Sequence, residues 1–343
     1  MNYVSVNLGR GEPDGDKELS FVLDEYDIKA EKIIAHKNIY QVFTPNSRFA
    51  LKKIDMEVGK LLFFLGAMNY LWQKGFYQMS RLVESRTGKL YVSFGPHLYF
   101  LTEWVEGKYP DFSQAAHLDA AVYLLADLHK KGEGFEPPQG SIPRNDLGRW
   151  PAKWQERICD LKMMQEFARF KSNDFDRVFG KIAGVALDDA FQALDILDSA
   201  GYPAFARRQS EIKPLCHRDF VYHNLVYRDG MAYLIDFEYC LQDSRLIDLA
   251  RFIRMTFINH PWELETAGRI ISGYQYYYPL NRTEEKLLSA VLTFPHDIWR
   301  IGHKWYLAGQ RKDSLYQLLC RQCQFYHQKN LLCHKLQQGF LSL

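Results

Sequence analysis

Three polar residues in the second half of the chain, Asp219, Asn224 and Asp236, have types and spacing that suit a metal-assisted reaction. Two apolar runs, 225–227 and 231–235, separate Asn224 from Asp236 and flank the sequence Arg-Asp-Gly. Asp-Gly between such runs favours a tight hairpin. Folding about it would place Asn224 opposite Asp236, within one residue of register. Oxygen ligands of this kind suit Mg²⁺, which proteins usually hold with one or two side chains plus phosphate oxygens.

Asp219 precedes the hairpin by one short loop and is the candidate catalytic residue. His-Arg-Asp, with Asn five residues after the Asp and Asp-Phe further on, is the arrangement of protein-kinase-type phosphotransferases. In it, the first Asp accepts a proton from an incoming hydroxyl or orients it, while Asn224 and Asp236 hold the metal. The alternative is a capped turn followed by an ordinary strand end. Both motifs occur in order around one hairpin, which favours the catalytic interpretation.

A lysine in the first third of the chain offers an independent test. Lys52 ends the sequence Phe-Ala-Leu-Lys in a predicted third strand, where kinases place a phosphate-binding lysine. Ala50 shares its face of the strand, because side chains alternate with period two, and leaves room for an adenine ring. Lys53 points the other way. A solvated strand lysine is the alternative interpretation.

The segment 101–107 has the position of a kinase hinge. There, the backbone groups of Glu103 and Val105 are expected to bind the adenine edge of ATP, so their side chains matter little. Trp104 is a candidate to stack near the adenine.

The elements around these residues predict an α+β fold with two lobes, resembling that of protein kinases. The first lobe, 1–105, is expected to bind nucleotide. Its predicted elements are a five-stranded sheet and one inserted helix, at about 28–35, 39–44, 48–54, 90–94 and 97–104 for the strands and 55–76 for the helix. The second lobe, 106–343, is predicted to be helical and to carry the catalytic loop and metal-binding hairpin. Gly107 and Pro110 mark the boundary between them.

Composition narrows the possible partners. The net charge of +2 over 343 residues indicates no nucleic-acid or membrane partner by itself. The N-terminal residues lack an apolar signal region, so we expect the protein in the cytoplasm at synthesis, with its six cysteines as free thiols. Cys320, Cys323 and His327 share a helical spacing that leaves a zinc site as an open alternative.

A set of short sequences carries a family resemblance: FALK, TEWVEG, LADLH, CHRDFVYHN, LIDFE and RLIDLARFIR. Together they resemble the aminoglycoside phosphotransferase and choline kinase group. Within that group, NDLGRWPAKWQERICDLK resembles the CotS-type spore-coat kinase-like proteins. The resemblance spans about Asp27 to Gln328. It implies ATP and Mg²⁺ as cofactors, a hydroxyl-bearing acceptor, a location in the spore coat and contacts with other coat proteins.

The resemblance also assigns roles by position. It makes Asp219 the catalytic aspartate, Asn224 and Asp236 the metal ligands, and Lys52 the phosphate-binding lysine. Asp248 matches a structural aspartate that braces the catalytic loop. The chain between Asp236 and Asp248 is too short for a protein-kinase activation segment, which favours a small-molecule kinase layout.

Three departures keep a second hypothesis open. The segment 34–40 has no glycine to cover phosphates, and no carboxylate lies between residues 58 and 83 to pair with Lys52. Glu238 and Arg218 also stand where relatives carry other residue types. The alternative function is therefore a catalytically weak or inactive pseudokinase that serves as a structural protein of the spore coat.

Overall fold

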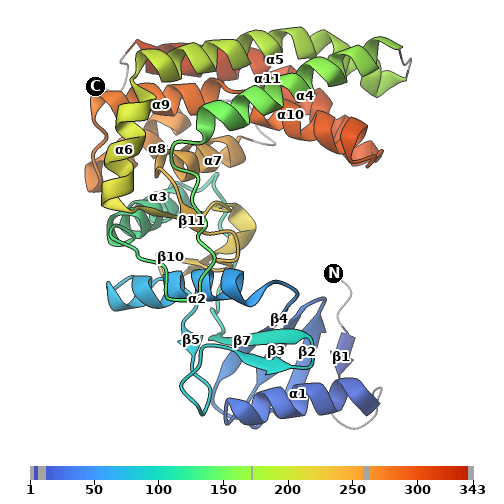
Figure 1. Ribbon diagram of the computed structural model, residues 1–343, viewed down its shortest axis with the longest axis vertical. Coiled ribbons are helices and arrows are strands. Elements are labelled where there is room, and N and C mark those ends of the chain that lie inside the picture. The colour runs from blue at the N-terminus through green and yellow to red at the C-terminus, as the bar shows by residue number, and fades with distance from the viewer. Residues whose placement is uncertain (1–3, 7–12, 171–172, 258–262, 339–343) are drawn as a thin grey trace.

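The computed structural model describes residues 4–6, 13–170, 173–257 and 263–338, which form two lobes of different kinds. A small lobe built on a β-sheet lies at one end of the molecule, and a larger helical lobe lies at the other (Figure 1). The predicted α+β fold, protein-kinase-like in its two lobes, is confirmed. None of the helices in the described ranges combines the length and apolarity needed to span a bilayer.

The small lobe contains a seven-stranded antiparallel sheet, where the sequence predicts five strands. Its strands are β1 Val4–Val6, β2 Lys32–His36, β3 Ile39–Phe43, β4 Arg48–Ile54, β5 Leu82–Val83, β6 Val92–Phe94 and β7 His97–Glu103. They are ordered β1-β2-β3-β4-β7-β5, and β6 pairs with β7. The two unpredicted strands, β1 and β5, have three and two residues, too few to show a period-two pattern.

Two helices pack on opposite faces of this sheet. Helix α1 (Pro13–Glu25) buries its apolar side chains against a face that includes Leu51 and Tyr99. Helix α2 (Val58–Gln73) packs on the other face, with Phe100, and lies between the sheet and the large lobe (Figure 1). Side chains alternate along a strand, so Lys52 lies on the α2 face.

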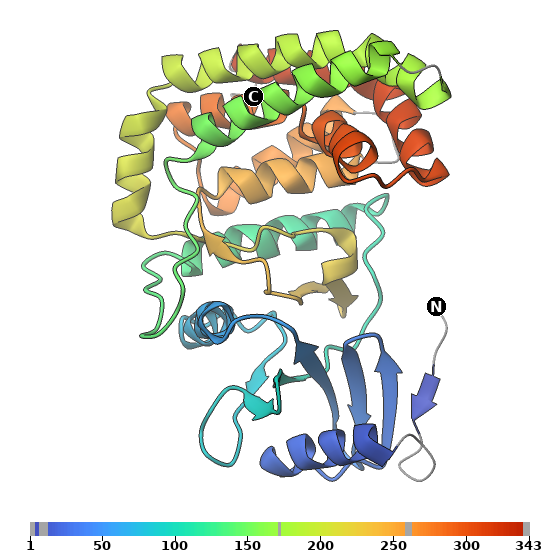
Figure 2. The same ribbon diagram turned by 45° about the vertical axis from the view of Figure 1, so that its right-hand side comes forward.

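The large lobe is a helical assembly with a few short strands. Its helices are α3 Ala115–Lys131, α4 Trp150–Phe170, α5 Asp174–Ser199, α6 Tyr202–Ile212, α7 Leu246–Thr256, α8 Leu264–Tyr277, α9 Arg282–Thr293, α10 His296–Gly302 and α11 Asp313–Gln337. Helices α4 and α5 lie side by side at the far end of the lobe in both ribbon views (Figure 2). The Cys320, Cys323 and His327 group lies within the single helix α11.

Short strands and two turns of helix complete the large lobe. Strand β8 (Leu215–Cys216) pairs with β11 (Leu241–Gln242), and the hairpin of β9 (Leu225–Arg228) and β10 (Met231–Leu234) lies between them in the chain. A turn of helix, Tyr222–Asn224, leads directly into the hairpin, and another, His303–Leu307, follows α10.

The segment 104–114 joins the lobes and pairs with the hairpin of the large lobe. The Lys108 N–H donates to the Tyr227 carbonyl at 3.1 Å, and the Tyr227 N–H donates to the Lys108 carbonyl at 2.7 Å. Gly107 has a φ of 147°, and a Cβ placed there would lie 2.6 Å from both the Tyr227 carbonyl oxygen and Val226 Cγ1. This close approach therefore requires a residue without a side chain.

We predict that Gly107→Ala destabilises the protein by about 2–4 kcal/mol, because it adds backbone strain and a clash with a backbone carbonyl. Urea unfolding measures the difference. Gly88 is the matched control, since its φ is also positive, at 74°, and a Cβ there would have no neighbour within 4 Å. Equal destabilisation by Gly88→Ala and Gly107→Ala would show that the contact with Tyr227 does not matter.

Candidate active site

The hairpin predicted from Asp-Gly is present. Strands β9 (Leu225–Arg228) and β10 (Met231–Leu234) pair so that Leu225 lies opposite Leu234. The two turn residues between them, Asp229 and Gly230, have φ values of 51° and 80°, the left-handed conformations that a tight hairpin turn needs. The Ile235 N–H donates to the Asn224 carbonyl at 3.0 Å, so Asp236 lies one residue beyond Asn224's partner.

Asn224 fixes the position of Asp219. Its Nδ2 donates to Asp219 Oδ2 at 2.8 Å and to the Asp219 carbonyl at 2.9 Å. Both acceptors are oxygens without protons, so the amide nitrogen must face Asp219, and Asn224 Oδ1 is left as an acceptor. Asn224 is 4% exposed. A buried amide oxygen with this orientation is suited to ligate a cation.

A buried carboxylate holds the loop that carries Asp219. Asp248, at the start of α7, accepts hydrogen bonds from the backbone N–H groups of His217 and Arg218, at 2.6 and 2.8 Å. Burial alone would raise the pKa of Asp248, but the hydrogen bond from His129, 3.3 Å away, and the nearby positive groups lower it. Asp248 therefore stays ionised and braces the loop, in the position that the resemblance implies.

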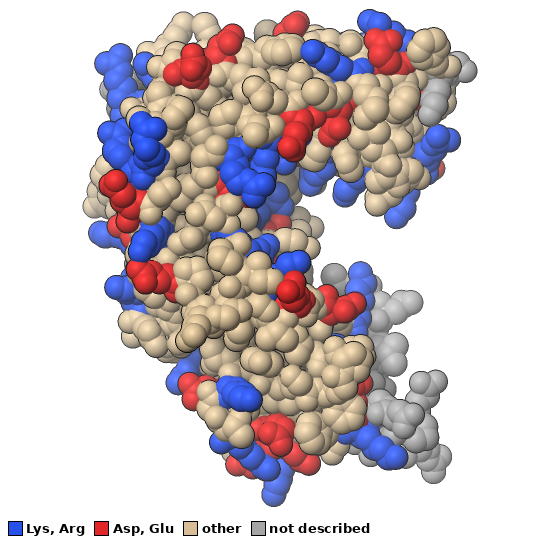
Figure 3. Space-filling model, viewed as in Figure 1, with Lys and Arg blue, Asp and Glu red and all other residues tan. Residues whose placement is uncertain are grey.

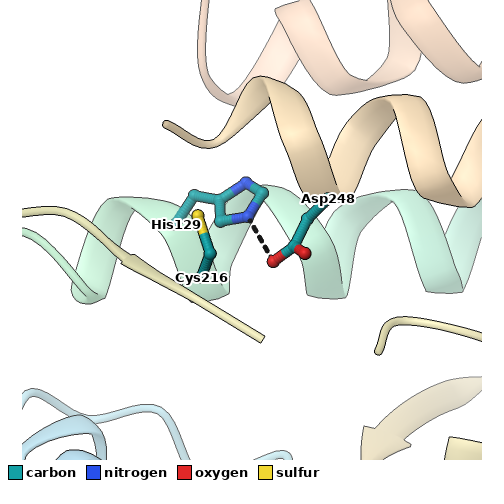
Figure 4. A group of neighbouring side chains, drawn as sticks. All are labelled: His129, Cys216 and Asp248. Carbon is teal, nitrogen blue, oxygen red and sulfur yellow. Dashed lines mark hydrogen bonds and ion pairs between the residues drawn. The ribbon is translucent and has the colours of Figure 1, made fainter. Parts of the chain in front are cut away.

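His129, Cys216 and Asp248 are close enough for their ligand atoms to hold a metal ion, within 4.8 Å of one another (Figure 4). Each is already engaged. His129 Nδ1 bonds to the Tyr274 hydroxyl at 2.8 Å, and Cys216 Sγ donates to the Asp243 carbonyl at 3.0 Å. Burial raises the pKa of Cys216 and so disfavours the thiolate that a metal would need. This trio is structural.

Two residues of the site have strained backbones. Arg218 and Asp236 have φ values of 67° and 68°, in the left-handed region that non-glycine residues seldom adopt. The edge of the His217 ring packs on Phe237 with centroids 4.9 Å apart, so the two strained loops share one buried contact. Strain of this kind costs about 1–3 kcal/mol per residue and persists where the surroundings impose it, typically at functional sites.

Lys52 reaches from the sheet of the small lobe to the hairpin loop of the large lobe. Its Nζ lies 2.8 Å from Asp236 Oδ1 and 3.0 Å from Glu238 Oε1. Burial alone would lower the pKa of Lys52, but these two carboxylates raise it, so the lysine is charged. Lys53 points to the opposite face, as predicted, where it pairs with Glu18 of α1.

Glu238 supplies a carboxylate partner that sequence reasoning did not identify. In kinases this partner comes from the helix of the small lobe, but here the N-cap residue of α2, Glu57, is exposed. The sequence feature that could have identified Glu238 is its position two residues after Asp236, a predicted metal ligand. The partners of Arg218 were also missed. They are Asp243 at 3.2 Å and Asp146 at 3.3 Å, which lie 25 and 72 residues away in the chain.

A cavity of about 700 Å³ lies between the lobes, within the size range of small-molecule sites. The apolar residues that line it include Ala50, Met68, Phe100, Val226 and Ile235. The polar residues Lys52, Asn224 and Asp236 line the same cavity. The predicted phosphate-binding lysine and both predicted metal ligands therefore meet in one cleft with an apolar wall.

The linker residues Glu103, Trp104 and Val105 also line this cavity. The Glu103 N–H donates to the Arg81 carbonyl and the Trp104 N–H to the Arg48 carbonyl, each at 2.9 Å. Among the described residues, no backbone hydrogen bond uses the Val105 N–H. The N–H of Val105 is thus available to a ligand that reaches the linker, whereas that of Glu103 is not.

The segment over the cleft is a tight turn without glycine. His36 pairs with Ile39, so only Lys37 and Asn38 form the turn between β2 and β3, and Lys37 has a φ of 54°. His36 and Ile39 line the cavity. This turn is too short to wrap around phosphates with a series of backbone amides, as a glycine-rich loop does.

Comparisons with known proteins show similarity to spore-coat proteins and to a kinase-like family. The family model described as "Spore coat putative kinase YutH" matches residues 20–330. Spore coat protein S of Bacillus subtilis (strain 168) is 24% identical over 296 residues, which cover 86% of this chain and 84% of that protein.

Three solved structures of similar fold are two phosphotransferases and a kinase. An aminoglycoside phosphotransferase from Alicyclobacillus acidocaldarius has a TM-score of 0.84 at 22% identity, over 94% of this chain and 96% of that one. A spectinomycin phosphotransferase has a TM-score of 0.62 at 14% identity, over 94% and 98%. An amicoumacin kinase has a TM-score of 0.59 at 14% identity, over 96% and 94%.

We predict that Asp248→Asn destabilises the protein by about 3–5 kcal/mol at neutral pH, because it breaks a buried charged network. The pKa of Asp248 is lowered on folding, so its contribution is complete above the unfolded value of about 4 and is lost as the pH falls through the lower folded value. Urea unfolding at pH 7 and below pH 4 tests this. Asp127→Asn, which removes a partly exposed helix pair with Lys131, is the control and should have a small effect. A loss from Asp248→Asn no larger than the control's would contradict the bracing role.

We also predict that Glu238→Gln lowers the pKa of Lys52, since one of two nearby negative charges is removed while burial is unchanged. Lysine side-chain NMR titration measures the shift. Glu18→Gln is the control, because Glu18 pairs with Lys53 on the other face of the sheet. An unchanged Lys52 titration in Glu238→Gln would show that the ion pair contributes nothing in solution.

Proposed function

The chain belongs to the spore coat putative kinase YutH family, and from that premise we propose that it is an ATP- and Mg²⁺-dependent phosphotransferase. It would transfer the γ-phosphoryl group to a hydroxyl of a small molecule or of a spore-coat component. One observation carries the proposal. Asn224 holds Asp219 through its amide nitrogen and keeps its oxygen free, so base and metal ligand are fixed together.

The residues present fit the proposed roles. Asn224 Oδ1 and the Asp236 carboxylate are hard oxygen donors that would hold Mg²⁺, which supplies neutralisation of the phosphate charge. Lys52 would bind phosphate oxygens. Its present ion pair with Asp236 would then be replaced by these contacts. Asp219 would orient the acceptor hydroxyl and take its proton. Catalysis of this kind is mostly positioning and charge stabilisation.

The cleft suits the nucleotide. Its apolar wall would take the adenine, and the Val105 N–H and Glu103 carbonyl would bind the adenine edge, with Trp104 beside them. Structural relatives support this assignment: the spectinomycin phosphotransferase was solved with ADP, and the amicoumacin kinase with AMP-PNP and Ca²⁺. Spore coat protein S supports a location in the coat and contact with other coat proteins.

A structural or binding role in the coat is the second candidate. The turn at Lys37 and Asn38 offers no glycine-rich cover for phosphates. Arg251 forms an ion pair with Asp219 Oδ1 and so occupies one oxygen of the proposed base. A protein that keeps the fold without turnover would have these features.

Two measurements decide between the candidates. We predict that millimolar Mg·ATP raises the melting temperature of both the wild type and Asp219→Asn, because a ligand of the folded state stabilises it. ATP turnover or autophosphorylation should fall by about 10²–10⁴-fold in Asp219→Asn, the usual contribution of a positioned base. Equal turnover in the two proteins would remove Asp219 from catalysis. The absence of any shift with Mg·ATP would favour the structural role.

A further inference from the structure

A second cavity lies in the large lobe, lined by two arginines that adjoin or contact Asp219. Its volume is about 180 Å³, and it shares no lining residue with the nucleotide cleft in the described chain. Arg218, the neighbour of Asp219, and Arg251, its ion-pair partner, both line this cavity. Asp219 itself lines neither cavity, but its carboxylate contacts Asn224, which lines the nucleotide cleft, and Arg251, which lines the second cavity, so an acceptor bound in the second cavity would lie beside the residues that hold the base.

We propose that this cavity binds the acceptor, and that the acceptor is a small hydroxyl compound carrying an anionic phosphate or carboxylate group. The acceptor role rests on the function proposed above. The preference for an anion rests on the cavity itself and can be tested without nucleotide.

The cavity has an excess of positive charge. Six cationic side chains line it: Lys153, Arg157, Arg218, Arg251, Arg254 and Arg300. The carboxylates among its lining residues number three: Asp146, Asp243 and Asp297. Figure 3 shows Lys and Arg side chains gathered on the large lobe beside the hollow between the lobes.

The three carboxylates are already shared among several cations. Asp146 pairs with Lys153 at 2.5 Å and with Arg218 at 3.3 Å. Asp297 pairs with Arg300 at 3.0 Å and lies 3.5 Å from Arg254. The carboxylates therefore leave part of the positive charge uncompensated.

Arg157 is the clearest uncompensated cation. It forms no ion pair with a carboxylate among the described residues. Its Nη1 lies 2.8 Å from His296 Nδ1, and its guanidinium lies over the Trp299 ring, 4.3 Å from the centroid. Burial, together with the neighbouring arginines Arg254 and Arg157, holds the pKa of His296 far below its usual value, so this partner is neutral.

Two arginines also have poorly satisfied donors inside the lobe. The Nε atom of Arg251 is buried and makes no hydrogen bond, and that of Arg254 is buried and has only an ion pair with Asp297 Oδ2 at 3.5 Å. Burial, together with the neighbouring arginines, lowers the pKa of Arg254 to about 10 although Asp297 acts in the opposite direction. Buried donors without acceptors are costly, and a phosphate or carboxylate would supply acceptors and charge together.

The remaining walls suit a carbon frame with hydroxyl groups. Trp150, Trp154 and Trp299 line the cavity and provide flat apolar surfaces. A cationic ligand would meet like charge on several sides, and a neutral one would leave the arginine donors unpaired. The arginine fork matches carboxylate and phosphate geometry, so both anions fit the same chemistry.

The test compares four probes on one three-carbon frame, using the full chain without ATP. Calorimetry would measure the dissociation constants of glycerol 3-phosphate, glycerate, glycerol and 3-aminopropane-1,2-diol. We expect at least one anionic probe to bind about tenfold tighter than the neutral and cationic probes, since hydrogen bonds to a charged group are about twice as strong as neutral ones. Comparing the dissociation constants of glycerol 3-phosphate and glycerate shows whether the site prefers a phosphate or a carboxylate.

Variants locate the binding. Arg157→Gln and Arg300→Gln should each weaken the tighter anionic probe by about tenfold, while Arg269→Gln, an exposed arginine that pairs with Asp119, should leave it unchanged. Circular dichroism would check that each variant is folded. Equal affinity for all four probes, no binding of either anion at millimolar concentration, or equal affinity in all three variants would overturn the proposal.

The two proposals can fail separately. Selective anion binding that depends on Arg157, in a protein whose melting temperature does not respond to Mg·ATP, would overturn the phosphotransferase and leave the anion site standing. A response to Mg·ATP without anion selectivity would overturn the anion site alone.

Discussion

The catalytic loop depends on one buried carboxylate. Asp248 accepts the backbone N–H groups of His217 and Arg218, the two residues before Asp219, and His129 bonds to the same carboxylate. Without the Asp248 carboxylate, the backbone N–H groups of His217 and Arg218 would lack acceptors. No interaction would then hold the backbone of Arg218 in its left-handed conformation. The position of Asp219 is thus set from α7, which lies behind the loop in the large lobe.

The second constraint is electrostatic and joins the lobes. Lys52 belongs to the sheet, while Asp236 and Glu238 belong to the loop after the hairpin. In the usual kinase layout, the lysine's carboxylate partner comes from a helix of the small lobe. Here both carboxylate partners of Lys52 come from the large lobe. The ion pairs of Lys52 can therefore form only when the two lobes lie close together. The absence of acidic residues from 58–83 is consistent with this arrangement.

Much of the fold and part of the site follow from local sequence. The hairpin at Asp229 and Gly230 is determined by a two-residue turn, and Lys52 by its period-two position in β4, so both were predictable. The partners of Arg218, and Arg251 as the partner of Asp219, depend on packing between distant segments. No spacing rule relates Asp146 to Arg218 across 72 residues, so only the folded structure shows that pair.

The linker contact at Lys108 has a consequence for how the lobes can move. Glu103 is the last residue of β7 in the small lobe, and Lys108 is already bonded to Tyr227 in the large lobe. The lobes are also joined at Leu234 of β10, whose N–H donates to the Gln78 carbonyl and whose carbonyl accepts from the Ser80 N–H, so two backbone contacts together limit rotation of one lobe against the other. Val105 lies between Glu103 and Lys108, so a ligand bound to its N–H would contact the linker beside the point where it bonds to the large lobe. Lys52 and Asp236 belong to different lobes, so the distance between them would report how far the cleft is open.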